Sequence, residues 1–311
     1  MNGAVTRRWP MAPILAAAAI VLAALLPFVS DPYIVGVGFN LLMWLALTQS
    51  WVVLSGMAGY VSLGIVVFVG IGSYTMVLLW QSVPLWLGIP VAGVAAAGFA
   101  ALVGTPVLRV RGPYFVILTF GLAEFVKYVV VNIEATLGKF SRLLMGAPDL
   151  TDLYLVMLVL AVAATAVTVF LGRTRFGSGL RAIRENEEAA ETLGVPVARF
   201  KMIAFTLSAA IPGVVGAILV LRTGYFDPVQ SFNPVVSFTV VTTAVIGGAD
   251  DARGPLFGAA FLTLLSELLW ANAPQVYMIL LGVLLIVFVL FVPRGIFTWF
   301  AERRRVADHA S

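Results

Sequence analysis

Residues 177–201 form an island of charge in an otherwise apolar chain, and no other stretch has such specific chemistry. Charged residues make up only 11% of the 311 residues, yet they crowd into this stretch, and apolar runs close in directly on both sides. A water-soluble segment held between membrane spans must contact something in water, so we expect it to bind another protein. Its charged members are Arg181, Arg184, Glu185, Glu187, Glu188, Glu191, Arg199 and Lys201.

Three further ionisable residues, Glu124, Lys127 and Glu267, lie within or close to apolar runs. A charge at the centre of a bilayer costs about 3 kcal/mol or more, so these side chains should face protein or water. Glu124 and Lys127 are three residues apart and can pair on one helix face near the outer interface, with substrate contact as the alternative. For Glu267 we favour a structural or subunit-interface role. A proton relay would instead make this an ion-coupled transporter, but the charges are few and scattered.

The charged segment contains a predicted helix of about three turns. Gly194 supplies a left-handed C-terminal cap position, and Pro196 blocks continuation of the helix. A helix that lies on a bilayer would be basic on its polar face and bulky on its apolar face. Here the polar face is acidic and the apolar face is mostly alanine, which favours docking to a cytosolic protein. The residues on the apolar side are Ala182, Ile183, Asn186, Ala189, Ala190 and Leu193.

Glycine interrupts the apolar segments in both halves of the chain, which is typical of a transport site at a repeat interface. Close helix packing is the alternative, especially for the small-residue spacings at Gly254–Gly258 and at 209–217. A faint five-plus-five inverted repeat would make 59–74 and 224–248 equivalent. The proposed pathway residues are Gly56, Gly59, Tyr60, Ser62, Gly64, Tyr114, Phe115, Gly247 and Gly248.

Composition fixes the class that these residues belong to. The chain is 61% hydrophobic and contains no cysteine, which excludes disulfides and thiolate metal sites, and we expect no metal site at all. Apolar runs of about twenty residues recur, and each is long enough to cross a membrane. We therefore predict an all-α polytopic membrane protein, one transmembrane domain over residues 1–311 with a polar tail at 302–311. The net charge of +4 lies in flanks and loops, which suits membrane orientation better than nucleic-acid binding.

Ten runs are candidate spans, and the glycine-rich 61–80 run and the short 235–248 run could each be broken or re-entrant. Eight crossings with two re-entrant segments fit nearly as well as ten. The runs are 12–29, 34–54, 61–80, 85–106, 114–131, 153–172, 202–221, 235–248, 255–272 and 276–292.

Positive charge predicts the orientation. Arg7 and Arg8 precede the first run, and an arginine triplet at 303–305 follows the last. By the positive-inside rule both termini are cytoplasmic, so the number of crossings is even. The 173–201 loop is then cytoplasmic and the 132–152 loop external.

Residues 181–195 and 199–210 resemble the coupling region of branched-chain amino acid ABC importer permeases, more the LivM-type subunit than its LivH-type partner. The resemblance covers most of the chain. It includes the Ser55–Gly64 segment, residues 111–115 with Glu124, and the glycine-containing segments 224–228, 246–248 and 254–258. Residues 137–146 depart from the family's glycine-rich run, and this external loop is a candidate contact for a binding protein or substrate.

The resemblance implies a translocation subunit that is not itself an enzyme. The chain has no G-x-x-x-x-G-K-[ST] loop, so ATP and Mg would be used by a partner. The implied partners are a LivH-like second permease, two ATP-binding cassette subunits and an extracytoplasmic solute-binding protein, in a bacterial inner membrane. The expected contacts with the ATPase are Arg181, Arg184, Glu185, Asn186, Glu188, Ala189, Ala190, Leu193 and Gly194.

The candidate pathway carries glycine, serine and aromatic residues with little fixed charge. This composition suits a small zwitterion with an apolar side chain, such as a branched-chain amino acid. The family resemblance leaves other small amino acids, urea and short amides as alternatives.

Overall fold

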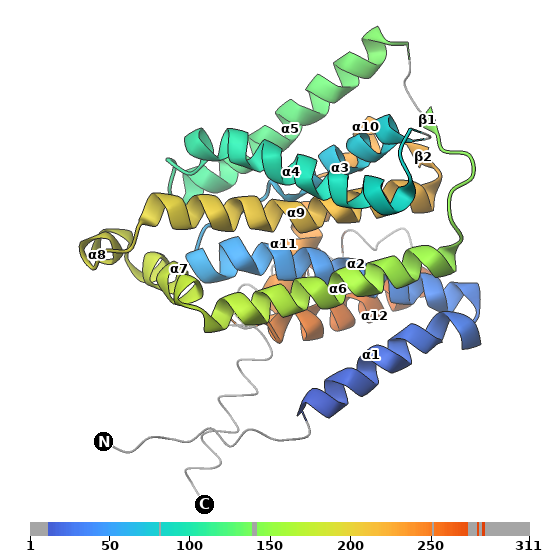
Figure 1. Ribbon diagram of the computed structural model, residues 1–311, viewed down its shortest axis with the longest axis horizontal. Helices are drawn as coiled ribbons and strands as arrows, with labels where there is room; N and C mark the ends of the chain where they lie inside the picture. The colour runs from blue at the N-terminus through green and yellow to red at the C-terminus, as the bar shows by residue number, and fades with distance from the viewer. Residues whose placement is uncertain are drawn as a thin grey trace, which may run out of the picture.

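The computed structural model describes residues 12–80, 82–138, 142–250, 252–272, 279 and 282–283. Helices dominate the described residues, and long helices run side by side as a bundle (Figure 1). Within the described residues, six helical stretches are long and apolar enough to cross a membrane, and three shorter apolar helices accompany them. The all-α polytopic prediction is therefore confirmed.

The elements follow the predicted runs closely, except that the run at 276–292 falls almost wholly outside the described residues. The helices before the charged segment are α1 (Ala12–Val29), α2 (Pro32–Trp51), the π-helical η1 (Val52–Gly56), α3 (Ile65–Leu79), α4 (Leu85–Val107), α5 (Pro113–Thr136) and α6 (Leu150–Arg173). The elements from there on are α7 (Arg175–Glu185), α8 (Glu187–Thr192), α9 (Val197–Thr223), α10 (Pro228–Ser231), α11 (Val235–Gly247) and α12 (Gly254–Asn272), with strands β1 (Arg142–Leu143) and β2 (Tyr225–Phe226).

The connections between helices alternate between two ends of the bundle (Figure 1). At the end that we call the charged end, Arg184 of α7 donates to Gly56 O at 2.8 Å and to Asp250 at 2.6 Å. At the opposite end, the strand end, β1 pairs antiparallel with β2, Arg142 opposite Phe226. Segments far apart in the sequence thus meet at each end, as expected if each connected helix crosses the membrane.

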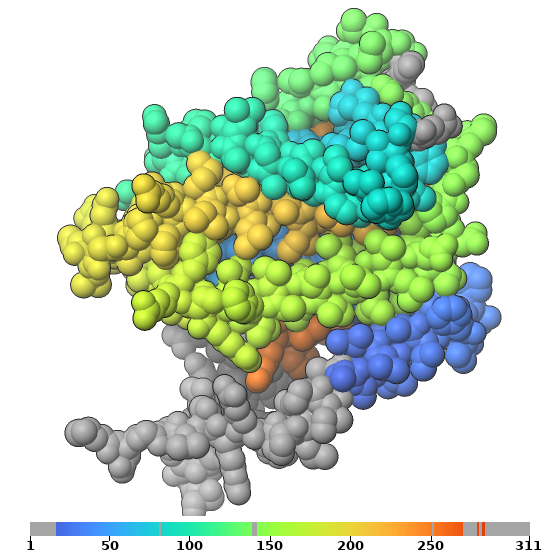
Figure 2. Space-filling view, viewed as in Figure 1, coloured from blue at the N-terminus to red at the C-terminus, as the bar shows by residue number. Residues whose placement is uncertain are grey.

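Small residues let the central helix α9 approach its neighbours closely. Together α4, α9 and α6 form much of the face shown in Figure 2. A Cβ on Gly213 would come within 2.5 Å of Ala96 Cβ on α4, and one on Gly216 within 1.9 Å of Val69 O on α3. Only glycine permits these contacts. The packing interpretation of the 209–217 spacing is therefore confirmed.

The α11–α12 pair uses the same device. A Cβ on Gly254 would lie 1.7 Å from Gly248 O, and one on Gly258 would lie 2.1 Å from Thr243 O. Gly247 is equally tight against Gly254 O, at 2.0 Å. The Gly254–Gly258 spacing therefore serves helix packing in this fold.

The 235–248 run is one continuous helix, α11, and the break in the chain lies just before it, at residues 232–234. Asp227 caps α10 by accepting the Val229 N–H at 2.8 Å, and the chain turns before α11 begins. Phe232 in this turn is fully buried against α3, where a Cβ on Gly70 would come within 2.2 Å of the phenyl ring. The chain thus passes from β2 at the strand end through α10 and α11 to Gly248 at the charged end.

The approach to α3 is also irregular, because residues 59–64 are not helical. Side chains from neighbouring helices satisfy the backbone of this segment. Trp51 Nε1 donates to Ser62 O at 2.9 Å, and the Leu63 N–H donates to Thr119 Oγ1 at 3.1 Å. Buried irregular backbone is stable only when its polar groups are satisfied in this way.

Candidate functional site

The charged segment folds as two helices, so the prediction of one continuous helix is wrong. Asn186 separates α7 from α8 with an extended backbone (φ −159°, ψ 112°). Its side-chain oxygen accepts the Ala189 N–H at 3.0 Å and caps α8. Asparagine competes with helical hydrogen bonding in this way, which makes it a better cap than a mid-helix residue.

The stop at the end of α8 is as predicted. Gly194 has φ +85°, and the Val195 N–H reaches back to Ala190 O at 3.0 Å. No atom lies within 4 Å of a Cβ placed on Gly194, so glycine is required here by backbone conformation and not by space.

Because of the break at Asn186, the side chains predicted to form one apolar side of a single helix point in two directions. Ile183 and Ala190 are buried against the bundle, whereas Ala189 is exposed and Leu193 is 81% exposed. The prediction that all these residues share one outward face is therefore wrong, because the turn at Asn186 changes the direction of α8. The exposed surface that remains includes Glu188, Ala189 and Leu193.

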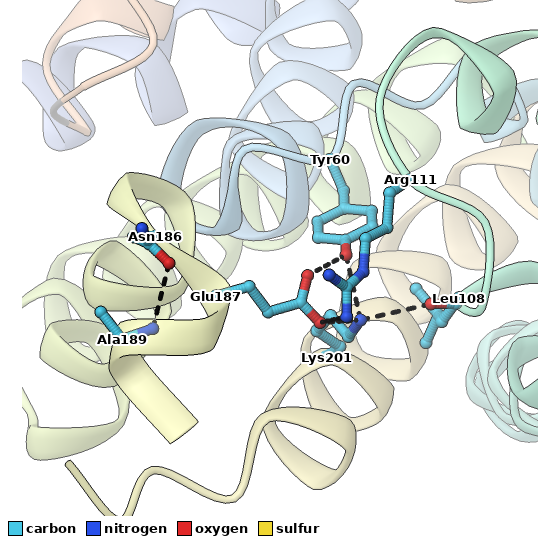
Figure 3. Close-up of polar contacts among 7 residues, drawn as sticks. All are labelled: Tyr60, Leu108, Arg111, Asn186, Glu187, Ala189 and Lys201. Atoms are coloured by element: carbon cyan, nitrogen blue, oxygen red, sulfur yellow. Dashed lines mark hydrogen bonds and ion pairs between the residues drawn. The ribbon is translucent and has the colours of Figure 1, made fainter. Parts of the chain in front are cut away.

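Glu187 is turned inward by the same break and is the centre of a group that we call the Glu187 cluster: Tyr60, Arg111, Glu187 and Lys201 (Figure 3). Lys201 Nζ lies 2.7 Å from Glu187 Oε1, and the Tyr60 hydroxyl donates to Glu187 Oε2 at 2.7 Å. Arg111 Nη2 lies 3.2 Å from Glu187 Oε1. One carboxylate thus joins α8 to α9, to the 59–64 segment and to the α4–α5 turn.

Lys201 is the most deeply buried cation of the cluster, with its side chain only 7% exposed. It donates to Glu187, to Tyr60 Oη at 3.0 Å and to Leu108 O at 3.2 Å, so each of its three donors has a partner. A buried ammonium is tolerated when it is paired and hydrogen-bonded in this manner.

The cluster also sets the ionisation of its members. Burial by itself would raise the pKa of Glu187, but hydrogen bonds from Lys201 and Tyr60 and the charges of Lys201 and Arg111 outweigh burial and hold that pKa below 4.5. Burial raises the pKa of Tyr60 above its ordinary value of 10.0, against the opposing effect of Lys201. Glu187 is therefore a carboxylate and Tyr60 a hydroxyl donor at neutral pH.

Arg184 of α7 makes a second connection to residues 56–64, which we call the glycine-rich segment. Besides its bonds to Gly56 O and Asp250, its side chain packs on Gly59, where an added Cβ would come within 3.0 Å of Arg184 Cγ. Gly59 also has φ +77°, so a side chain there would be strained as well as crowded. The glycine-rich segment is therefore contacted by both short helices, by α7 through Arg184 and by α8 through Glu187.

Other predicted coupling residues occupy varied positions around α7 and α8. Arg181 donates to Gly172 O at 3.0 Å, and Glu185 and Glu188 are exposed without a hydrogen bond or ion pair among the described residues. None of Arg181, Glu185 or Glu188 belongs to the Glu187 cluster.

The predicted pathway residues divide into three groups. Gly56, Gly59, Tyr60, Ser62 and Gly64 meet near the charged end, and Phe115 joins them through an edge-to-face contact with Tyr60 at 5.1 Å. Tyr114, next to Phe115, points away and is exposed. Gly247 and Gly248 belong to the α11–α12 contact.

Sequence reasoning placed Glu187 on the solvated acidic face and gave no role to Lys201 or Arg111. The available signal was Lys201 itself, a lysine at the edge of the long apolar run 202–221. In the described part of the chain, no three His, Asp or Glu side chains gather as metal ligands would.

Two other expectations concern ionisable residues in spans. The predicted pair of Glu124 and Lys127 forms an ion pair on α5. Glu267 of α12 accepts a hydrogen bond from the Tyr33 hydroxyl of α2, which is a structural contact between helices.

Comparisons with known proteins agree with this architecture. Residues 39–289 match the family described as branched-chain amino acid transport system, permease component. The chain is 31% identical to the high-affinity branched-chain amino acid transport system permease protein LivM of Escherichia coli, over 90% of this chain and 73% of that protein. It is 30% identical to LivM of Salmonella typhimurium over the same shares of both chains. It is 26% identical to a probable LivH of Methanocaldococcus jannaschii over 46% of this chain and 42% of that protein. No solved structure matches the chain.

Proposed function

The chain belongs to the permease family of branched-chain amino acid transport systems and is a membrane-spanning subunit of an ABC importer, and from this premise we propose how it is coupled to ATP hydrolysis. The exposed surface of α7 and α8 docks a separate ATPase, and the Glu187 cluster transmits its motion to the glycine-rich segment. The chain itself is a transport subunit and not an enzyme. ATP and Mg are bound by the ATPase.

The observation that carries this proposal is the position of Glu187. It lies on the shortest helix of the charged segment, and its carboxylate contacts Tyr60 of the glycine-rich segment at 2.7 Å. A displacement of α8 by a docked protein would therefore act on residues 59–64 through one ion-paired contact. Coupling of this kind requires a connected network with a partner-facing side and a pathway-facing side.

The partner-facing side includes Glu188, Ala189 and Leu193, together with Arg181, Glu185 and Gly194 as further contacts. These residues are exposed at the charged end, which we place in the cytoplasm because Arg7, Arg8 and the 303–305 triplet flank the outermost predicted spans. Both termini are then cytoplasmic, in a bacterial inner membrane.

The strand end would then face the solute-binding protein. Leu143 and Met145 in the divergent 137–146 loop are exposed there, while residues 139–141 lie outside the described chain. Arg142 is held by two hydrogen bonds to the buried Glu134, at 2.6 and 2.9 Å, which fixes β1 to α5. We propose that this anchored loop contributes to the docking surface, beside a LivH-like second permease.

The proposed solute is a branched-chain or other small amino acid. The relatives named LivM and LivH support this class, as does the scarcity of fixed charge among the proposed pathway residues. Urea or short amides remain the alternative within the same family.

Reconstitution of the chain with its ATPase, partner permease and binding protein tests the proposal. Uptake of leucine should require ATP and the binding protein, and competing urea should not reduce it. Uptake driven by a proton gradient without the ATPase would overturn the ABC mechanism.

A narrower test is the pair Glu188→Arg and Ala189→Trp, two exposed positions on α8. The variant should retain its thermal stability but lose ATPase co-purification and uptake. Unchanged co-purification would refute docking at α8.

A further inference from the structure

A cavity of about 780 Å³ lies beside the Glu187 cluster, between the end of α4, the α4–α5 turn and the start of α9. Three members of the cluster, Arg111, Glu187 and Lys201, line it, but the coupling proposed above places no ligand in it. Its wall is rich in cations, with four basic side chains and two carboxylates, Glu187 and Glu191. The basic side chains are Arg109, Arg111, Arg199 and Lys201.

The four cations are not equally available. Lys201 and Arg111 are both engaged by Glu187. Arg109 and Arg199 are exposed and have no ion pair or hydrogen bond from their side chains among the described residues. The wall therefore presents two arginines whose donors can bind an incoming anion. Two guanidinium groups that line the same cavity suit a phosphate, because each can donate two parallel hydrogen bonds to it.

Exposed apolar side chains lie at the cavity on the stretches of α4 and α9 that belong to the predicted apolar spans. Leu102 of α4, three residues before the cavity-lining Thr105, is 75% exposed, and Ile203 of α9, which itself lines the cavity, is 52% exposed. A ligand in the cavity would thus have cations around one end and exposed hydrocarbon along the other. This combination is typical of the site for an anionic lipid at a membrane interface.

We propose that this cavity binds the phosphate headgroup of an anionic phospholipid, with Arg109 and Arg199 as its ligands and the acyl chains along Leu102 and Ile203. The lipid belongs to the leaflet at the charged end. Its phosphate lies next to Arg111, so the same arginine contacts the headgroup site and the Glu187 cluster.

The test uses the purified transporter in nanodiscs of equal phosphatidylglycerol and phosphatidylcholine, with retained lipids counted by native mass spectrometry. The wild type should retain phosphatidylglycerol preferentially. Arg109→Gln and Arg199→Gln should each lower that preference roughly fivefold, from about 1 kcal/mol per basic residue near an anionic surface. Arg109→Lys with Arg199→Lys should restore part of it.

Arg175→Gln is the matched control, because Arg175 is also exposed at the charged end but does not line the cavity. It should leave the preference unchanged. An equal loss in Arg175→Gln, or no loss in either cavity variant, would overturn the proposal.

Two further measurements distinguish a bound lipid from other occupants of the cavity. Millimolar inorganic phosphate should not displace the retained lipid, and displacement would assign the cavity to a free phosphate instead. Addition of the ATPase subunit should leave lipid retention intact. Loss of the lipid on ATPase binding would mark the cavity as a protein-docking surface and overturn the lipid assignment.

Discussion

Glu187 shows how much one carboxylate can join in a chain with few charges. It accepts hydrogen bonds from Lys201 and Tyr60 and forms an ion pair with Arg111, and these three residues belong to three other segments. Each of these donors would lose a charged acceptor if the carboxylate were removed, and the buried Lys201 would lose its counter-ion. Breaking such a pair from one side costs more than replacing both partners.

We therefore predict opposite outcomes for single and double variants. Glu187→Gln should lower the free energy of unfolding by about 3 kcal/mol, because it leaves the Lys201 ammonium buried without a counter-ion. Glu187→Gln with Lys201→Met should recover most of that stability but should not recover ATP-driven uptake. Thermal unfolding and reconstituted uptake measure the two effects.

Glu188→Gln is the control for both variants, because it removes the same kind of carboxylate from an exposed residue that does not contact Lys201, Tyr60 or Arg111. Its unfolding temperature should match the wild type. If Glu187→Gln were equally harmless, the cluster would not hold α8 in place.

The depressed pKa of Glu187 predicts a pH dependence with a definite sign. Its folded-state pKa lies below the ordinary value of 4.5, so the carboxylate adds stability that is present above pH 4.5. That stability is lost as the pH falls through the folded-state pKa. The difference in unfolding temperature between wild type and Glu187→Gln should thus be constant near neutral pH and shrink in acid. A difference that grew on acidification would contradict this assignment.

Sequence reasoning succeeded for residues whose role is local. The Glu124–Lys127 pair follows from a spacing of three, and the stop at Gly194 follows from glycine and a following proline. It failed for Glu187 because the spacing alone places several glutamates on one face. Which of them turns inward depends on the break at Asn186 and on a lysine fourteen residues away.

At the scale of elements, glycine decides where helices touch. The α11–α12 contact depends on Gly254, where a Cβ would lie 1.7 Å from Gly248 O, a backbone atom that cannot move aside. Gly254→Ala should therefore overpack the contact and destabilise the protein by about 1–3 kcal/mol. Thermal unfolding of the purified permease would measure the loss.

Gly98→Ala is the matched substitution, because nothing lies within 4 Å of a Cβ at that position of α4. It should be neutral or stabilising by about 0.5–1 kcal/mol, from the lower entropy of the unfolded chain. Equal destabilisation by both alanines would mean that the close α11–α12 approach does not govern stability.

Helices with continuous apolar sequence were predictable to within a few residues, because a run of about twenty apolar residues has few alternatives in a membrane. The helices that are preceded or interrupted by irregular backbone were less predictable. The turn between α10 and α11 depends on Phe232 packing on Gly70, more than 150 residues earlier in the chain. A contact of that range is not encoded in local propensity. The sequence therefore indicated irregular backbone without saying whether the segment crosses or returns.

At the scale of the whole molecule, the alternating connections place the two proposed docking surfaces at opposite ends of the bundle. The charged end brings together α7, α8, the 59–64 segment and Asp250, and the strand end joins 142–143 to 225–226. Charge counting predicted which loops share a side, and the contacts among the described residues agree with that grouping. The five-plus-five repeat stays a prediction.

The separation of the two ends leads to a labelling prediction that uses the absence of cysteine from the chain. Leu193→Cys at the C-terminal end of α8 and Met145→Cys near β1 each introduce a single thiol at an exposed position, where the native side chains are 81% and 74% exposed. In intact cells, a membrane-impermeant maleimide should label position 145 and spare position 193. In inverted membrane vesicles the pattern should reverse, because positive charge at both termini places the charged end in the cytoplasm.

Labelling of both positions from one side would contradict the alternation of crossings, whereas the opposite pattern would keep the fold but invert the protein. In the inverted case, α8 would lie outside the cell, where no ATP is available to an ATPase docked on it.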